Sequence, residues 1–90
     1  MTVCSSFFVK NKLGFHACAA AKLTQVASRF PCEVVVVNGD QTVNAKSVMG
    51  LLLLCGAKGT ELVIEAEGER ADEAVRAIGE LIDARFGEEE

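Results

Sequence analysis

The sequence has no tryptophan, no tyrosine, one proline and one histidine among its 90 residues. Its longest apolar run, near residues 51–55, is far shorter than the roughly 20 residues that a membrane-spanning helix needs. No basic segment followed by a long apolar one marks a signal peptide at the N-terminus. These absences predict a cytoplasmic protein without membrane insertion. The length fits one domain, residues 1–90, with a single modest core.

The four cysteines do not form a C-x-x-C pair. They are widely spaced at Cys4, Cys18, Cys32 and Cys55, and no export signal accompanies them. A secreted disulfide framework is therefore the weaker interpretation. Free cysteines among apolar neighbours are usually buried, and we expect this of Cys4, Cys32 and Cys55.

Positive charge is sparse and unevenly placed. Residues 1–58 hold six lysines and arginines against two acidic residues, a net charge of +4. Residues 59–90 hold eleven acidic residues against three arginines, a net charge of −8. A nucleic-acid-binding domain requires a stronger basic surface, so we expect no nucleic acid as partner. A mildly basic half suits an acidic protein partner or a phosphoryl group.

Apolar spacing predicts seven elements in the order β-α-β-β-α-β-α. The expected strands cover residues 2–9, 32–37, 42–45 and 61–66, and the expected helices cover 17–29, 48–55 and 71 to about 86. Asn38-Gly39 marks a hairpin between the second and third strands, and Pro31 stops the first helix. One antiparallel sheet covered on one face by the helices satisfies this α+β pattern, with the other face solvated.

The single histidine lies where a glycine-containing loop meets the first predicted helix. Gly14 and Phe15 precede His16, and Ala17 follows it. The first turn of a helix has unpaired N–H groups and a partial positive charge, and both favour an anion. A histidine side chain is largely neutral and nucleophilic near pH 7, so His16 is a candidate phosphoryl acceptor. The alternative is a surface or capping residue without chemistry.

A serine precedes the second predicted helix. Ser47 is well placed to cap that helix, and most serines in this position do nothing more. The residues that follow are more apolar than one side of a short helix can bury: Val48, Met49, Leu51, Leu52, Leu53 and Leu54. Some should therefore be exposed and mark an interface. The alternative for Leu51 and Leu54 is packing against the last helix.

Two motifs resemble a known family over essentially the whole chain. Gly14-Phe15-His16-x-x-Ala19-Ala20 is similar to the Gly-Leu-His-x-Arg-Pro-Ala-Ala segment of the histidine-containing phosphocarrier family, HPr. Ala45-Lys46-Ser47-Val48-Met49-Gly50 resembles the family's Ser-Ile-Met-Gly region, and its Ser-Val-Met-Gly sequence is closer to the branch of the family that is regulated at serine. The resemblance implies the family fold, an open-faced β-sandwich with four antiparallel strands covered on one face by three helices.

The resemblance also implies a function. His16 would accept a phosphoryl group from enzyme I, which uses phosphoenolpyruvate, and pass it to enzyme IIA proteins. Ser47 would be the regulatory site of an HPr kinase/phosphorylase. The protein would act as a monomer and as the substrate of these enzymes rather than as an enzyme, without a metal or cofactor. Its docking face would comprise Ala17, Ala21, Val48, Met49 and Leu52.

The chain departs from the family pattern beside the histidine. Cys18 occupies the position of the family's arginine, and Ala19 that of its proline. A thiol cannot reproduce the forked contacts of a guanidinium, although Lys12 could supply a point charge. Two alternatives follow: a regulatory binding module controlled through Ser47, with transfer at His16 impaired, or a thiol sensor in which Cys18 reacts at the helix start.

Overall fold

The structure is a computed structural model that describes residues 2–54 and 56–88. Within these residues, four strands and three α-helices follow one another in the predicted order, and a short 3-10 turn comes last. Their bounds are β1 Thr2–Phe8, α1 Ala17–Ala27, β2 Glu33–Asn38, β3 Gln41–Asn44, α2 Val48–Leu52, β4 Glu61–Glu67, α3 Ala71–Asp83 and η1 Arg85–Gly87. No helix in this described part is both long enough and apolar enough to cross a bilayer.

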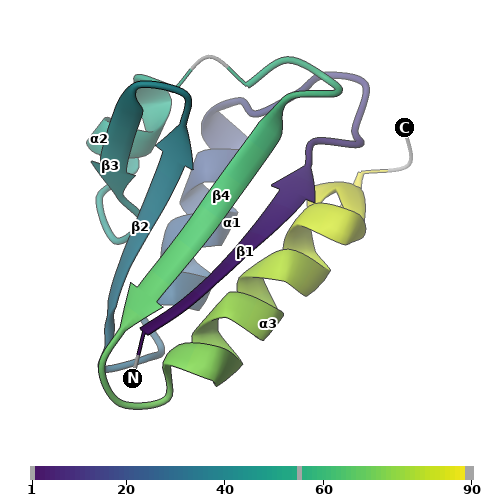
Figure 1. Ribbon diagram of the computed structural model, residues 1–90. Helices are drawn as coiled ribbons and strands as arrows, with labels where there is room; N and C mark the ends of the chain where they lie inside the picture. The colour runs from purple at the N-terminus through teal and green to yellow at the C-terminus, as the bar shows by residue number, and fades with distance from the viewer. Residues whose placement is uncertain (1, 55, 89–90) are drawn as a thin grey trace.

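The four strands form one antiparallel sheet in the order β1-β4-β2-β3. Helices α1 and α3 lie side by side against one face of this sheet, and α2 packs against α1 and β3 (Figure 1). The predicted α+β fold is therefore confirmed. The β4 strand lies between β1 and β2, although it comes last of the four in sequence (Figure 1).

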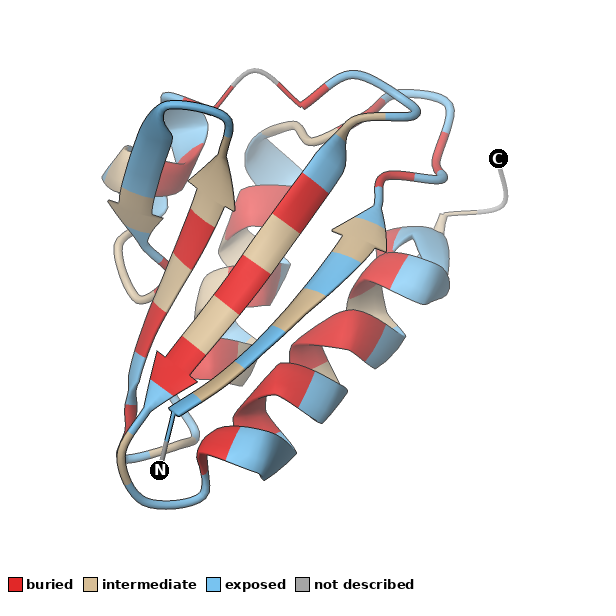
Figure 2. Cartoon of the chain, in the orientation of Figure 1, coloured by how far each residue is buried: buried red, intermediate tan, exposed pale blue. Residues whose placement is uncertain are grey.

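Burial alternates along the strands, as expected for a sheet with one covered face (Figure 2). Val34 and Val36 of β2 and Leu62 and Ile64 of β4 face the helices and are buried. The expectation of a buried Cys4 is wrong. Cys4 is opposite Glu65 on the uncovered face and is exposed, because alternate residues of β1 point to solvent.

The burial of the other cysteines differs from one to the next. Cys32 is buried in the core, as expected, whereas Cys55 lies outside the described residues. Cys18 is exposed at the start of α1.

Helix ends differ most from the sequence prediction. Helix α1 ends at Ala27, two residues early, and α2 ends at Leu52 instead of near residue 55. The prediction that α3 continues through Phe86 is wrong. The helix ends at Asp83, and Phe86 has a left-handed backbone, φ 54°, inside the 3-10 turn. This turn directs the Phe86 ring onto Phe15, with ring centroids 5.7 Å apart. Phe86 fits the helical spacing of α3 in the sequence, although the chain changes direction before it.

Candidate functional site

The loop before α1 is fixed by close backbone contacts. Gly14 has φ +72°, and a Cβ there would lie 2.5 Å from the Gly56 carbonyl oxygen, so this approach requires glycine. The Phe15 N–H donates to that same oxygen at 2.6 Å. Asn11 is fully buried and donates from Nδ2 to the Gly14 carbonyl at 2.6 Å. The loop therefore presents the next residue, His16, in a defined position.

His16 is the N-cap of α1. Its backbone is extended, and its carbonyl accepts the first helical bond, from the Ala20 N–H at 2.9 Å. Its ring nitrogen Nδ1 accepts from the Cys18 N–H at 3.2 Å. The side chain is 30% exposed, and in the described part of the chain no hydrogen bond reaches the N–H groups of Ala17 and Ala19. The predicted position at the helix start is confirmed, and the ring itself engages one of the first amides.

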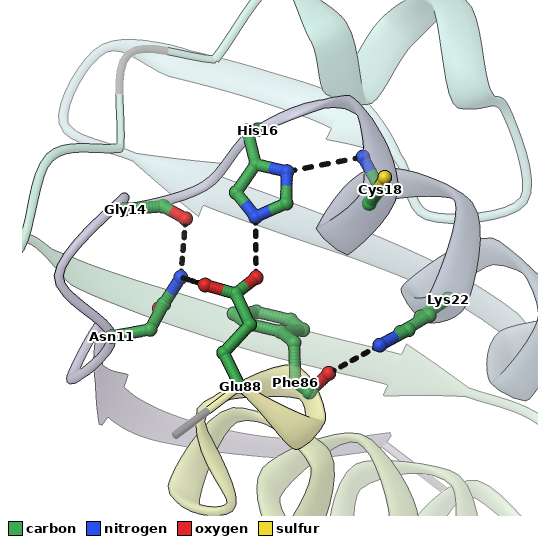
Figure 3. Close-up of polar contacts among 7 residues, drawn as sticks. All are labelled: Asn11, Gly14, His16, Cys18, Lys22, Phe86 and Glu88. Carbon is green, nitrogen blue, oxygen red and sulfur yellow. Dashed lines mark hydrogen bonds and ion pairs between the residues drawn. The ribbon is translucent and has the colours of Figure 1, made fainter. Parts of the chain in front are cut away.

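The second ring nitrogen of His16 contacts a carboxylate from the other end of the chain. Nε2 forms a hydrogen bond with Glu88 Oε2, and Glu88 Oε1 accepts from Asn11 Nδ2 at 3.1 Å (Figure 3). A carboxylate can only accept, so Nε2 carries the hydrogen, and Nδ1 then accepts with its lone pair. Sequence reasoning missed both Glu88 and Asn11, which no local pattern connects to His16.

A folded segment holds Glu88 in place. Phe86 is 0% exposed and packs edge-to-face on Phe15. Lys22 of α1 donates from Nζ to the Phe86 carbonyl at 2.6 Å (Figure 3). The carboxylate thus reaches His16 from an anchored turn, and the cation of Lys22 lies near enough to favour its negative charge.

The His16 contact predicts a pH dependence. The hydrogen bond from His16 lowers the pKa of the Glu88 carboxyl below its usual 4.5, partial desolvation opposes this, and Asn11 and Lys22 add to the lowering. A depressed folded-state pKa contributes stability above the unfolded-state value, and this contribution is lost as pH falls through the folded-state value. We expect Glu88→Gln to be less stable than the wild type at pH 7, and we expect this difference to disappear as the pH falls through the lowered folded-state pKa of Glu88.

Urea unfolding followed by circular dichroism measures this difference. Glu67→Gln, at the far end of β4, removes the same charge away from His16 and is the control. A Glu88→Gln difference that is constant across pH would contradict the expectation.

Ser47 caps α2. Its Oγ accepts from the Gly50 N–H at 3.1 Å, and the residue is half-buried. The capping prediction is confirmed. Its hydroxyl lies at the helix start, where a helix dipole favours added negative charge.

Three comparisons bear on identity. The family model described as the phosphorylation site of the phosphotransferase-system component HPr matches residues 3–84. A phosphocarrier protein HPr of Neisseria meningitidis is 49% identical over 85 residues, which cover 94% of this chain and 96% of that protein. The chain belongs to the HPr family of phosphocarrier proteins. An HPr of Pseudomonas aeruginosa is 51% identical over 81 residues, covering 89% of this chain and 90% of that protein.

Solved structures agree with the family assignment. The crystal structure of an HPr from Thermoanaerobacter tengcongensis superimposes with a TM-score of 0.92 at 39% identity, covering 98% of this chain and 99% of that one. As an HPr-family member, the chain is a phosphoryl carrier of the phosphotransferase system and not an enzyme.

This HPr-family chain exposes apolar side chains on and directly after α2. Met49 is 81% exposed, Val48 and Leu52 of α2 are also exposed, and so is Leu53 directly after the helix; α2 packs against α1. Ala17 is exposed and Ala21 half-buried on α1, so all five predicted docking residues reach the surface. Leu51 and Leu54 are buried, as the alternative in the sequence analysis required, although the contacts of α2 are with α1 and β3.

The remaining predicted residues lie near the helix start. Cys18 and Lys12 are exposed, Lys12 in the loop before His16. Within residues 2–54 and 56–88, no group of three potential metal ligands is close enough to hold an ion.

Proposed function

We propose that this chain carries the phosphoryl group on Nδ1 of His16, receiving it from enzyme I and donating it to enzyme IIA proteins in the cytoplasm. The observation that carries this proposal is the hydrogen bonding of the two nitrogens of the His16 ring. Nε2 is engaged by Glu88, which leaves the lone pair on Nδ1, at the helix start. A single chain provides all of these groups, so we propose that it acts as a monomer.

The local geometry suits the chemistry of transfer. Nδ1 attacks phosphorus, the N–P bond forms, and the bond from phosphorus to the donor breaks with its electrons leaving on the donor. The Cys18 N–H, released from Nδ1, then donates to a phosphoryl oxygen together with the N–H groups of Ala17 and Ala19, which have no partner among the described residues. Such a ring of amides at a helix N-terminus stabilises a phosphate without any side-chain charge.

Labelling tests the carrier role directly. The protein is incubated with enzyme I and labelled phosphoenolpyruvate. The wild type should acquire acid-labile label, and His16→Ala should acquire less than about 1% of it because no other histidine exists. Circular dichroism confirms that the variant folds. Label that persists in His16→Ala, or a wild type that takes no label, contradicts the proposal; the second result leaves a regulatory module controlled through Ser47.

We propose in addition that Cys18 occupies the position of the family's arginine and that the backbone amides replace only part of the contact that the arginine provides. The Cys18 side chain is exposed at the first turn, where a guanidinium could contact a phosphoryl group on His16. In the same assay, Cys18→Arg should accept label about tenfold faster, the effect of one added charge-assisted contact. Equal rates would show that the amides suffice.

Ser47 is proposed as the site of an HPr kinase/phosphorylase. A phosphoserine carries about −1.5 to −2 charges, and here it would adjoin the exposed apolar side chains of Val48 and Met49. An acidic partner docked on that surface would be repelled.

A matched pair of variants separates charge from capping. Ser47→Asp adds a charge, whereas Ser47→Asn caps a helix equally well without one. We expect kcat/KM for phosphoryl acceptance from enzyme I to fall about tenfold in Ser47→Asp and to change little in Ser47→Asn. Equal losses in both variants would assign the effect to the cap and not to charge.

A further inference from the structure

The turn that presents Glu88 has an unfavourable backbone. Arg85, Phe86 and Gly87 have φ values of 58°, 54° and 82°, and the first two lack glycine's freedom in this region. The turn is closed by hydrogen bonds from the Gly87 N–H to the Ala84 carbonyl at 3.0 Å and from the Glu88 N–H to the Arg85 carbonyl at 2.9 Å. Two successive left-handed residues persist only where the surroundings require them. Here they bring the Glu88 carboxylate to His16.

Asn11 provides an independent observation on the same carboxylate. Its amide is fully buried, and its Nδ2 bridges the Gly14 carbonyl and Glu88 Oε1. Its Oδ1 is buried without a hydrogen-bond partner among the described residues. An unpaired buried acceptor is unfavourable, and the two hydrogen bonds from Nδ2 offset this cost. These two bonds therefore set the orientation of the amide, because both of their partners are acceptors. Asn11 thereby links the loop that fixes His16 to the carboxylate that contacts its ring (Figure 3).

We propose that Glu88 is a positioning residue for phosphoryl transfer. It accepts a hydrogen bond from the Nε2–H of His16 and so keeps the lone pair on Nδ1. Its negative charge stabilises the positive charge that the ring acquires when Nδ1 binds the phosphoryl group. Asn11 holds the other carboxylate oxygen. This inference rests on the proposed role of His16 as the phosphoryl acceptor.

The step balances without a proton transfer. The neutral ring carries its hydrogen on Nε2, and the Nδ1 lone pair becomes the N–P bond as the bond between phosphorus and the donor breaks. The hydrogen stays on Nε2, so the ring becomes an N-phosphorylated imidazolium facing the Glu88 carboxylate. When the group moves to the next carrier, the N–P electrons return to Nδ1 and the ring is neutral again. A carboxylate already in contact with Nε2 needs no rearrangement in either direction.

The experiment must allow for the end of the sequence, where Glu89 and Glu90 follow Glu88 and could replace it. The matched control is therefore E89Q/E90Q, which retains Glu88. The test variants are E88A/E89Q/E90Q, which removes the acceptor, and E88Q/E89Q/E90Q, which retains an acceptor oxygen but removes its charge. Two readouts are measured: the ring nitrogen-15 shifts at pH 8, where the single histidine gives one unambiguous set, and the single-turnover rate from saturating phosphorylated enzyme I.

The control should show the Nε2–H tautomer and the wild-type rate. We expect E88A/E89Q/E90Q to show a mixture of tautomers and a rate about tenfold lower, and E88Q/E89Q/E90Q to keep the tautomer while losing most of the same rate. A wild type labelled on His16 together with an alanine variant of unchanged tautomer and rate would overturn this inference alone. Absence of label on the wild type would overturn the carrier role on which it rests.

Discussion

Phe86→Ala should lower the free energy of unfolding by about 3–5 kcal/mol, the usual cost of removing a fully buried phenyl ring. Phe86 is 0% exposed and packs edge-to-face on Phe15. Alanine would leave a cavity beside the Phe15 ring, and it would still have to adopt φ 54° without the ring that holds the turn. Because a small domain is stable by only about 5–15 kcal/mol, this single ring is a large share of the total.

Urea unfolding followed by circular dichroism measures the effect, since the chain has no tryptophan or tyrosine for fluorescence. Phe8→Ala is the matched control, because Phe8 is the same residue type but is exposed at the end of β1. Its cost should be below about 1 kcal/mol. If Phe86→Ala unfolds completely, Phe86→Leu should retain the fold at a cost of about 1–2 kcal/mol. Two phenylalanines of equal cost would show that the turn does not depend on the ring.

The same variant tests the link between packing and chemistry. Glu88 is two residues beyond Phe86, and the Phe86 carbonyl accepts a hydrogen bond from Lys22 Nζ. Releasing the ring should also release the carboxylate from His16. A folded Phe86→Ala protein should therefore accept phosphoryl groups more slowly than Phe8→Ala does.

Most of the fold could be predicted from the sequence because its signals are local. Alternation in residues 61–66 and helical spacing from Ala71 to Ile82 reflect one covered face, and the structure confirms both. The caps His16 and Ser47 could also be predicted, since an N-cap is decided by residues within one turn. The hairpin at residues 38–41 follows from its glycine.

What the sequence did not predict depends on contacts between distant residues. Glu88 meets His16 and Asn11 across 72 and 77 positions, and nothing in the sequence around Glu88 marks it as a partner of these residues. The break after Asp83 was concealed because Phe86 continues the spacing of α3. Cys4 was misplaced for a related reason: a thiol among apolar residues does not reveal which face of its strand is covered.

Gly14→Ala should be the most damaging change in the loop that carries His16. An alanine Cβ at this position would lie 2.5 Å from the Gly56 carbonyl oxygen and 3.1 Å from the Ala57 Cα. Both are backbone atoms, so relief requires the loop to move away from the segment around Gly56. That movement breaks the 2.6 Å hydrogen bond from the Phe15 N–H to the Gly56 carbonyl and displaces the residue that follows, His16.

Gly39→Ala separates this clash from the cost of a left-handed backbone. Gly39 has φ +59°, similar to the +72° of Gly14, but nothing lies within 4 Å of its Cβ position. Gly39→Ala should therefore cost about 1–2 kcal/mol, the price of the conformation alone, and Gly14→Ala about 3–4 kcal/mol in urea unfolding. Under conditions where both variants are folded, Gly14→Ala should accept label from enzyme I at least about tenfold more slowly, because a small displacement of a nucleophile is costly. Equal stabilities and equal rates for the two variants would show that the loop accommodates a side chain at Gly14 and does not fix the position of His16.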